Sequence, residues 1–134
     1  MKKPKQQAER WLRQAEHDLA VAQIHLQNGY YSDCCFMSEQ TAQRGLKAFL
    51  FGKGERVVPE HSIGRLMKRA QAFDNGFQPF LEAAGVLDQY YIPTRYPDAL
   101  GEPAVPFESY TKGQAAQALE FAQSILNLVK QKLG

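Results

Sequence analysis

The feature that most constrains the fold of this 134-residue chain is an apolar stripe in its first quarter, which recurs every three or four residues. The stripe marks one face of a helix predicted over residues 6–27, which ends at the turn formed by Asn28 and Gly29. Its members are Leu12, Ala15, Leu19, Ala22 and Leu26. Because the side chains of a strand alternate every two residues, this spacing favours a helix over a strand.

The same periodicity predicts four more helices. They run from about Tyr30 or Ser32 to Phe51, from about Ser62 to Phe73, from Phe77 or Gln78 to about Tyr91, and from about Thr111 to Leu133. The last helix carries two adjacent apolar stripes, so we expect it to pack on more than one neighbour. Three long antiparallel helices joined by short turns favour an all-α bundle. The wide apolar faces also favour a homodimer, whose symmetric interface would cover what the core leaves exposed.

Four prolines interrupt the helical pattern over residues 92–110: Pro93, Pro97, Pro103 and Pro106. Proline lacks the N–H that a helix interior needs, so this segment is predicted to be a loop. Such a long loop within a compact domain is often functional or mobile. The expected organisation is one helical domain over residues 1–134, with a basic tail at 1–7.

Composition narrows the classes of protein to consider. Apolar residues make up 44% of the chain and charged residues 22%, which is typical of one globular domain. No apolar run reaches the roughly 18 residues of a membrane helix, and no apolar segment follows the basic start as in a signal peptide. Adjacent Cys34 and Cys35 are unsuited to a mutual disulfide, so we expect reduced thiols, helix packing and a cytoplasmic location.

Charge is distributed unevenly along the chain. The net charge is +2, but residues 44–69 carry seven Lys or Arg against two Glu, a local net charge of +5. Two interpretations stay open for this stretch: a surface that faces an anionic partner, or a solvated face beside a more acidic remainder.

Known catalytic and cofactor motifs are missing from the sequence. The three histidines, His17, His25 and His61, do not have metal-ligand spacing, so no metal site is predicted. Gly52-Lys53-Gly54 lacks the pattern of a phosphate-binding loop, and no cofactor-binding motif is found.

A polar row lies on the second predicted helix. Gln40, Arg44 and Lys47 are spaced i, i+4 and i+7, which places them on one helix face, and Gln43 is four residues before Lys47. The row is either an exposed polar face or a line of hydrogen-bond donors that holds an anion or a partner's carboxylate.

The second candidate group lies at the start of the proline-rich loop. Tyr90 to Asp98 contains three tyrosines, Arg95 and Asp98, held between prolines. A fixed guanidinium suits bidentate recognition of phosphate or carboxylate. The alternative is an Arg95–Asp98 pair that only fastens the loop, with tyrosine rings closing the bundle end. His61 is a further candidate, either as a catalytic base or as a helix-start residue whose ring bonds a backbone group.

Four segments, in this order, resemble the HEPN family (higher eukaryotes and prokaryotes nucleotide-binding domain). They are Trp11–Leu19, Tyr30–Leu50, Pro59–Ile63 and Tyr91–Asp98, and the likeness covers about residues 8 to 132. The resemblance implies an up-and-down antiparallel bundle of four long helices plus a short one, and a homodimer. It also implies a separate minimal nucleotidyltransferase as partner, often in a toxin–antitoxin pair.

Some HEPN proteins are metal-independent ribonucleases that use an Arg followed four to six residues later by a His. Here no histidine follows Arg95, which weakens the nuclease interpretation because imidazole is the usual acid–base group near neutral pH. The resemblance directs attention to Arg95 and Asp98, and to a lesser extent to Lys47 and His61.

Three hypotheses follow. The first is a non-catalytic dimer that binds a nucleotide, a nucleic acid or a nucleotide-handling partner through Arg95, Tyr96, Asp98 and the Gln40–Lys47 row. The second is a metal-independent endoribonuclease. The third is a dimeric scaffold without a ligand.

Overall fold

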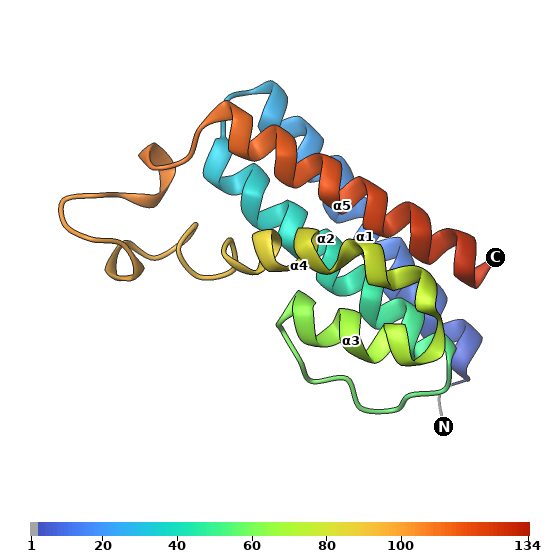
Figure 1. Ribbon diagram of the computed structural model, residues 1–134. Coiled ribbons are helices and arrows are strands. Elements are labelled where there is room, and N and C mark those ends of the chain that lie inside the picture. The colour runs from blue at the N-terminus through green and yellow to red at the C-terminus, as the bar shows by residue number, and fades with distance from the viewer. Residues whose placement is uncertain (1–2) are drawn as a thin grey trace.

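The computed structural model describes residues 3–134 and consists of five α-helices with no strand in that range (Figure 1). The helices are α1 (Pro4–Gln27), α2 (Tyr31–Gly52), α3 (Ile63–Phe73), α4 (Leu81–Asp88) and α5 (Lys112–Leu133). Short 3₁₀ turns form at Asn75–Phe80, Pro97–Ala99 and Pro106–Glu108. The predicted all-α class is confirmed.

The helix ends differ from the expectations in two places. Residues 1 and 2 of the predicted tail lie outside the described residues, and the chain is helical from Pro4, so residues 4–7 of that tail belong to α1. The fourth helix is short, because Asn75–Phe80 forms a 3₁₀ turn around Pro79 and α4 starts only at Leu81. The bundle therefore has three long helices and two short ones, where the resemblance implied four long ones.

The three long helices form the body of the molecule. α1 runs antiparallel to α2, with the Trp11 ring near the start of α1 lying 5.4 Å from the Phe51 ring at the end of α2. α5 runs in the same direction as α2, because the Cys34 thiol donates to the Ala115 carbonyl at their starts and Gly52 faces Leu133 at their ends. α1 is therefore antiparallel to both α2 and α5, as predicted, whereas α2 and α5 are parallel to each other.

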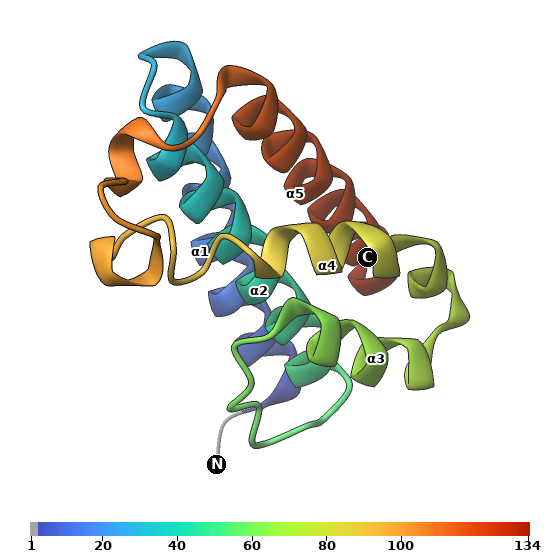
Figure 2. The same cartoon turned by 60° about the vertical axis from the view of Figure 1, so that its left-hand side comes forward.

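α3 and α4 form a hairpin that lies across the C-terminal half of α2 (Figure 2). The predicted inner face of α3 is buried as expected: Ile63, Leu66, Met67 and Ala70. Phe77 from the 3₁₀ turn packs 4.6 Å from the Phe49 ring of α2. The fourth helix was predicted to reach about Tyr91 with Tyr91 on its buried face, but α4 ends at Asp88, and Tyr90 is buried instead.

α5 packs on α1, α2 and α4, as its two stripes predicted. It begins with a capping box in which Thr111 Oγ accepts from Gln114 N and the Gln114 side chain accepts from Thr111 N.

Both cysteines are free and fully buried between helices, which confirms their packing role. Burial raises the pKa of the Cys35 thiol to about 12.

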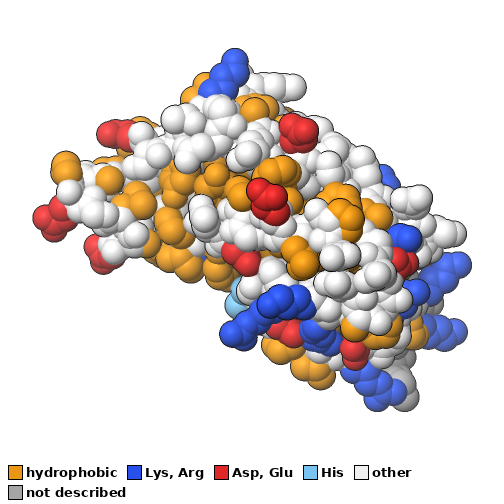
Figure 3. All heavy atoms as spheres, in the orientation of Figure 1, with side chains coloured by type: hydrophobic (Ala, Val, Ile, Leu, Met, Phe, Trp, Pro, Cys, Tyr) orange, Lys and Arg blue, Asp and Glu red, His pale blue; other side chains and the backbone are white. Residues whose placement is uncertain are grey.

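The loop at 92–110 extends away from the bundle at the end where α5 begins (Figure 1). Hydrophobic atoms lie on the molecular surface over this loop (Figure 3). Four of its apolar side chains are exposed: Ile92, Tyr96, Val105 and Phe107. Within residues 3–134, no helix is both long and apolar enough to cross a membrane.

Candidate functional site

The polar row of α2 faces the protein interior. Gln40, Gln43 and Lys47 are each less than 10% exposed, and only Arg44 is partly open to solvent. The interpretation of this row as an exposed polar face is therefore wrong. α3, the segment before it and the start of the 92–110 loop cover the row, which turns it into the wall of a recessed site.

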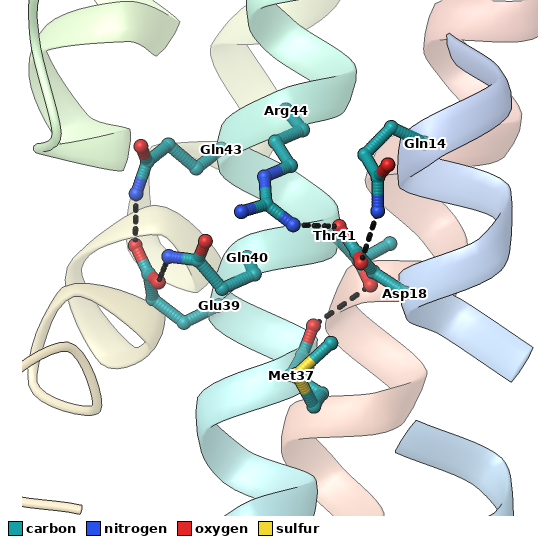
Figure 4. Close-up of polar contacts among 8 residues, drawn as sticks. All are labelled: Gln14, Asp18, Met37, Glu39, Gln40, Thr41, Gln43 and Arg44. Carbon is teal, nitrogen blue, oxygen red and sulfur yellow. Dashed lines mark hydrogen bonds and ion pairs between the residues drawn. The ribbon is translucent and has the colours of Figure 1, made fainter. Parts of the chain in front are cut away.

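Glu39 of α2 lies behind two residues of this wall, Gln40 and Gln43, and has no exposed surface. One carboxylate oxygen accepts from Gln40 Nε2 at 2.7 Å and the other from Gln43 Nε2 at 2.8 Å (Figure 4). Burial, together with a smaller effect of the nearby Asp88 carboxylate, raises the pKa of Glu39 to about 7. The two amide donors and the Arg95 charge act in the opposite direction without cancelling the effect of burial.

Gln43 connects this acid to His61. The Gln43 carbonyl oxygen lies 3.3 Å from His61 Nδ1, and the His61 ring stacks on Tyr91 with centroids 5.3 Å apart. The helix-start role predicted for His61 belongs to Ser62, whose hydroxyl accepts from Arg65 N at 3.2 Å. His61 therefore presents its ring to side chains of the site rather than to a backbone group.

Asp88, at the end of α4, fixes the start of α3 and so the position of His61. Its carboxylate accepts from the Ser62 hydroxyl and from Gly64 N, both at 3.0 Å, and from Ile63 N. A carboxylate at a helix N-terminus satisfies free N–H groups and interacts favourably with the helix dipole. The Asp88 side chain thus links the end of α4 to the start of α3 directly beside the site.

Arg95 is held by backbone and aromatic contacts. Its Nε and Nη2 donate to the Tyr91 carbonyl at 2.9 and 2.7 Å, and its guanidinium carbon lies 4.3 Å from the Phe36 ring centroid. The rings of Tyr91 and Tyr96 lie 5.0 and 4.9 Å from the same carbon. Among the described residues, no hydrogen bond or ion pair joins Arg95 to Asp98, so the predicted alternative of an Arg95–Asp98 fastening is wrong.

The two cations of α2 differ in their surroundings. Arg44 donates to the Asp18 carboxylate of α1 at 2.7 Å, and Gln14 supports the same carboxylate at 3.0 Å (Figure 4). Lys47 places its ammonium group 5.5 Å from the centroid of the Trp11 ring. Burial lowers the pKa of Lys47, and the Glu60 charge partly offsets that effect.

These side chains surround one pocket of about 410 Å³. It is lined by Trp11, Phe36, Gln40, Gln43, Arg44, Lys47, His61, Tyr91 and Arg95. Five of the seven predicted site residues line it, namely Gln40, Arg44, Lys47, His61 and Arg95. Tyr96 does not line the pocket, although its ring contacts the Arg95 guanidinium. Asp98 is exposed in the Pro97–Ala99 turn and does not line the pocket either.

Among the residues that the structure describes, three Lys or Arg side chains and three aromatic rings line the pocket, and no carboxylate does. Such a set can hold an anion by charge-assisted hydrogen bonds and can stack a flat ring beside it. Within residues 3–134, no group of three or more His, Cys, Asp or Glu is arranged to hold a metal ion.

Glu39, Gln43 and Asp88 are part of the site but were not among the predicted site residues. For Glu39 the sequence held a signal: it falls on the apolar stripe of α2, four residues after Cys35 and three before Ala42. A carboxylate on a buried stripe needs partners, and its neighbours Gln40 and Gln43 supply them.

Known proteins share the sequence pattern and the fold of this chain. The profile of the HEPN domain matches residues 8–132. "Putative toxin MJ1304" of Methanocaldococcus jannaschii is 27% identical over 131 residues, which cover 92% of this chain and 86% of that protein.

Two solved structures share the fold over nearly the whole chain. TT1696 from Thermus thermophilus is 40% identical with a TM-score of 0.88, over 94% of this chain and 98% of that one. ST0689, described as an archaeal HEPN homologue, is 36% identical with a TM-score of 0.79 over the full length of both chains. The chain therefore belongs to the HEPN domain family, as its sequence resemblance indicated.

Proposed function

We propose that the pocket binds the phosphate group of a nucleotide or nucleic acid, with the base against its aromatic wall. The observation that carries this proposal is the lining itself: within the described residues, Arg44, Lys47 and Arg95 converge from two segments beside three aromatic rings, with no carboxylate among them. Cations next to aromatic faces are the usual combination at sites for single nucleotides and single strands.

The charges of the site favour an anionic ligand. Burial lowers the pKa of Lys47, which means that its ammonium form is penalised in the empty pocket. A bound phosphate would offset that penalty by charge pairing. Arg44 and Arg95 each use part of the guanidinium for the fold, through Asp18 and the Tyr91 carbonyl, so both groups are pre-oriented before a ligand arrives.

The proposal is tested by titrating uridine 5′-monophosphate into the protein and following the fluorescence of Trp11, the only tryptophan of the chain. Removing one charge-assisted hydrogen bond costs about 1.5–3 kcal/mol, or roughly 10–100-fold in Kd. We expect that loss for Lys47→Met and for Arg95→Gln, and no change for Lys68→Gln, an exposed control on α3. If all four proteins bind equally, the pocket is not the site. A lower Tm for Arg95→Gln with unchanged binding would support the ligand-free scaffold instead.

The wider role we propose is that of the toxin-like component of a toxin–antitoxin-type pair, acting as a homodimer with a separate nucleotidyltransferase partner. The family membership and the similarity to a protein named as a toxin support this role. Exposed apolar side chains on the 92–110 loop, with Phe107 69% exposed, offer a surface for such contacts.

Light scattering after size exclusion tests the dimer, and co-expression with a nucleotidyltransferase from the adjacent reading frame tests the pair. We expect a mass of two chains and co-purification of the nucleotidyltransferase. We expect Phe107→Ser to weaken either the dimer or the contact with that partner. A monomer that copurifies with nothing would contradict this role.

A second candidate function is metal-independent RNA cleavage, favoured by one specific contact pattern. His61 and Arg95 are 34 positions apart in sequence but line the same pocket and share Tyr91. An imidazole there can take the proton of a ribose 2′-OH, whose oxygen then attacks phosphorus. The P–O5′ bond breaks, a 2′,3′-cyclic phosphate remains, and the leaving 5′-oxygen takes a proton from water. Cleavage of total RNA in the presence of a chelator, lost in both His61→Ala and Arg95→Gln, would establish this activity; RNA that stays intact excludes it.

A further inference from the structure

A second hollow lies beside the pocket, along the outer face of α1. It has a volume of about 720 Å³ and is lined by Gln7, Arg10, Trp11, Arg13, Gln14, His17 and Arg44. Trp11 and Arg44 line both hollows, so the two adjoin at these side chains. Arg44 lies between Gln43 of the pocket and Gln14 of α1 (Figure 4).

The charged side chains of this groove all carry the same sign. Arg10, Arg13 and Arg44 line it together with His17, and none of the described carboxylates does. Of the acids of α1, Asp18 is 1% exposed and pairs with Arg44 of the groove, Glu16 lies 3.9 Å from Lys130 of α5, and Glu9 is exposed but is not among the residues that line the groove. Potentials of one sign in a groove attract a chain of opposite charge.

The length of the groove exceeds what one nucleotide needs. Residues 7 to 17 of α1 span roughly 15 Å at the helical rise. Stacked nucleotides follow one another at about 3.4 Å along a strand, so the groove alone could accommodate about four of them. Trp11 lies where the two hollows adjoin and lines both of them, so an aromatic side chain is present at the junction.

We propose that the α1 groove is a second subsite that holds the neighbouring phosphates of a single-stranded oligonucleotide, one nucleotide of which occupies the pocket. The inference rests on the proposed function, because the pocket supplies the first nucleotide. It assigns to Arg10 and Arg13 a role in binding the strand and no role in binding a mononucleotide. The aromatic side chain of Trp11 at the junction favours a nucleic acid, whose bases can stack on it, over an acidic peptide, which has charge but no bases.

The experiment compares uridine 5′-monophosphate with oligouridylates of four and eight nucleotides, and uses octaglutamate as a charge-matched peptide. Affinities come from Trp11 fluorescence for the mononucleotide and from the anisotropy of end-labelled ligands for the others. The variants are Arg13→Gln, which changes an exposed side chain of the groove alone, and Lys5→Gln, which removes the same charge from an exposed position of α1 outside both hollows.

We expect the tetranucleotide to bind at least tenfold more tightly than the mononucleotide. Arg13→Gln should weaken tetranucleotide binding about three- to tenfold, reduce its salt slope by about 0.7 and leave mononucleotide binding unchanged. Lys5→Gln should behave as wild type.

Three results would overturn the inference, and they differ in what they leave standing. If the mononucleotide binds but the tetranucleotide binds no more tightly, or if Arg13→Gln has no effect, the groove is not a subsite and the proposed function survives. If octaglutamate binds as tightly as the octanucleotide, the groove is specific for charge rather than for nucleic acid. If wild type binds no nucleotide of any length, the proposed function fails and the inference fails with it.

Discussion

The buried carboxyl of Glu39 should make the stability of this protein fall as the pH rises toward neutral. Glu39 has no exposed surface, and burial raises its pKa from 4.5 to about 7. Below pH 4.5 both the folded and the unfolded chain hold the proton. Between pH 4.5 and 7 the folded state keeps it while the unfolded state releases it, so each rise in pH favours unfolding.

The size of the effect follows from the difference between the two pKa values. One pKa unit corresponds to about 1.4 kcal/mol, so the free energy of unfolding should lose about 3 kcal/mol between pH 4.5 and 7 through this group alone. Glu39→Gln keeps the shape and can still bond the amides of Gln40 and Gln43 after they reorient. We expect the variant to match wild type near pH 4.5 and to exceed its stability by about 3 kcal/mol at pH 8, or by about 10 °C in Tm.

Urea denaturation of both proteins at half-unit steps from pH 4.5 to 8 measures the difference directly. Other titrating groups cancel, because they are the same in both proteins. Glu120→Gln, which changes an exposed acid of α5, is the matched control and should show a difference that does not vary with pH. A constant difference for Glu39→Gln, or one that decreases with pH, would refute the assignment of Glu39 as a buried, proton-holding acid.

Three further substitutions test the contacts around the site by urea denaturation. Asp88→Ala removes the acceptor for Ser62, Ile63 and Gly64 and should cost about 1–2 kcal/mol; a loss under about 0.3 kcal/mol would contradict its capping role. Arg44→Gln leaves the buried Asp18 carboxylate without its charged donor and should cost about 1–3 kcal/mol, with most of that cost absent when Asp18→Asn is added. Thr111→Ala breaks the capping box of α5 and should cost about 1 kcal/mol, while an unchanged midpoint would show that the box is not needed.

The helices were predictable because each carries a continuous apolar stripe. The middle of the α1 stripe and most of the α5 stripes are buried, and the inner face of α3 is fully buried. The direction of α5 was not predictable, because the segments between α2 and α5 are long enough to return the chain to either end of the bundle. The late start of α4 follows from Pro79: its missing N–H and fixed φ fit the 3₁₀ turn that Asp74 caps through Gly76 N.

The positively charged residues of the site could be predicted from the sequence, but the burial and the neighbours of these residues could not. Spacing placed Gln40, Arg44 and Lys47 on one face, but only the packing of the α3–α4 hairpin shows that this face is covered. Asp98 was selected because it is close to Arg95 in sequence. The turn at Pro97 separates the two, and the Nε and Nη2 donors of Arg95 are directed to the Tyr91 carbonyl.

The most direct test of the central claim, that the pocket binds a nucleotide, is a ¹⁵N–¹H NMR titration with uridine 5′-monophosphate. The single indole N–H of Trp11, the Arg95 Nε–H and the side-chain amides of Gln40 and Gln43 report from the pocket wall. The account predicts that these signals shift together with one saturating Kd, while the backbone signals of residues 103–109 stay in place. Shifts confined to 103–109, or no shifts at all, would contradict it.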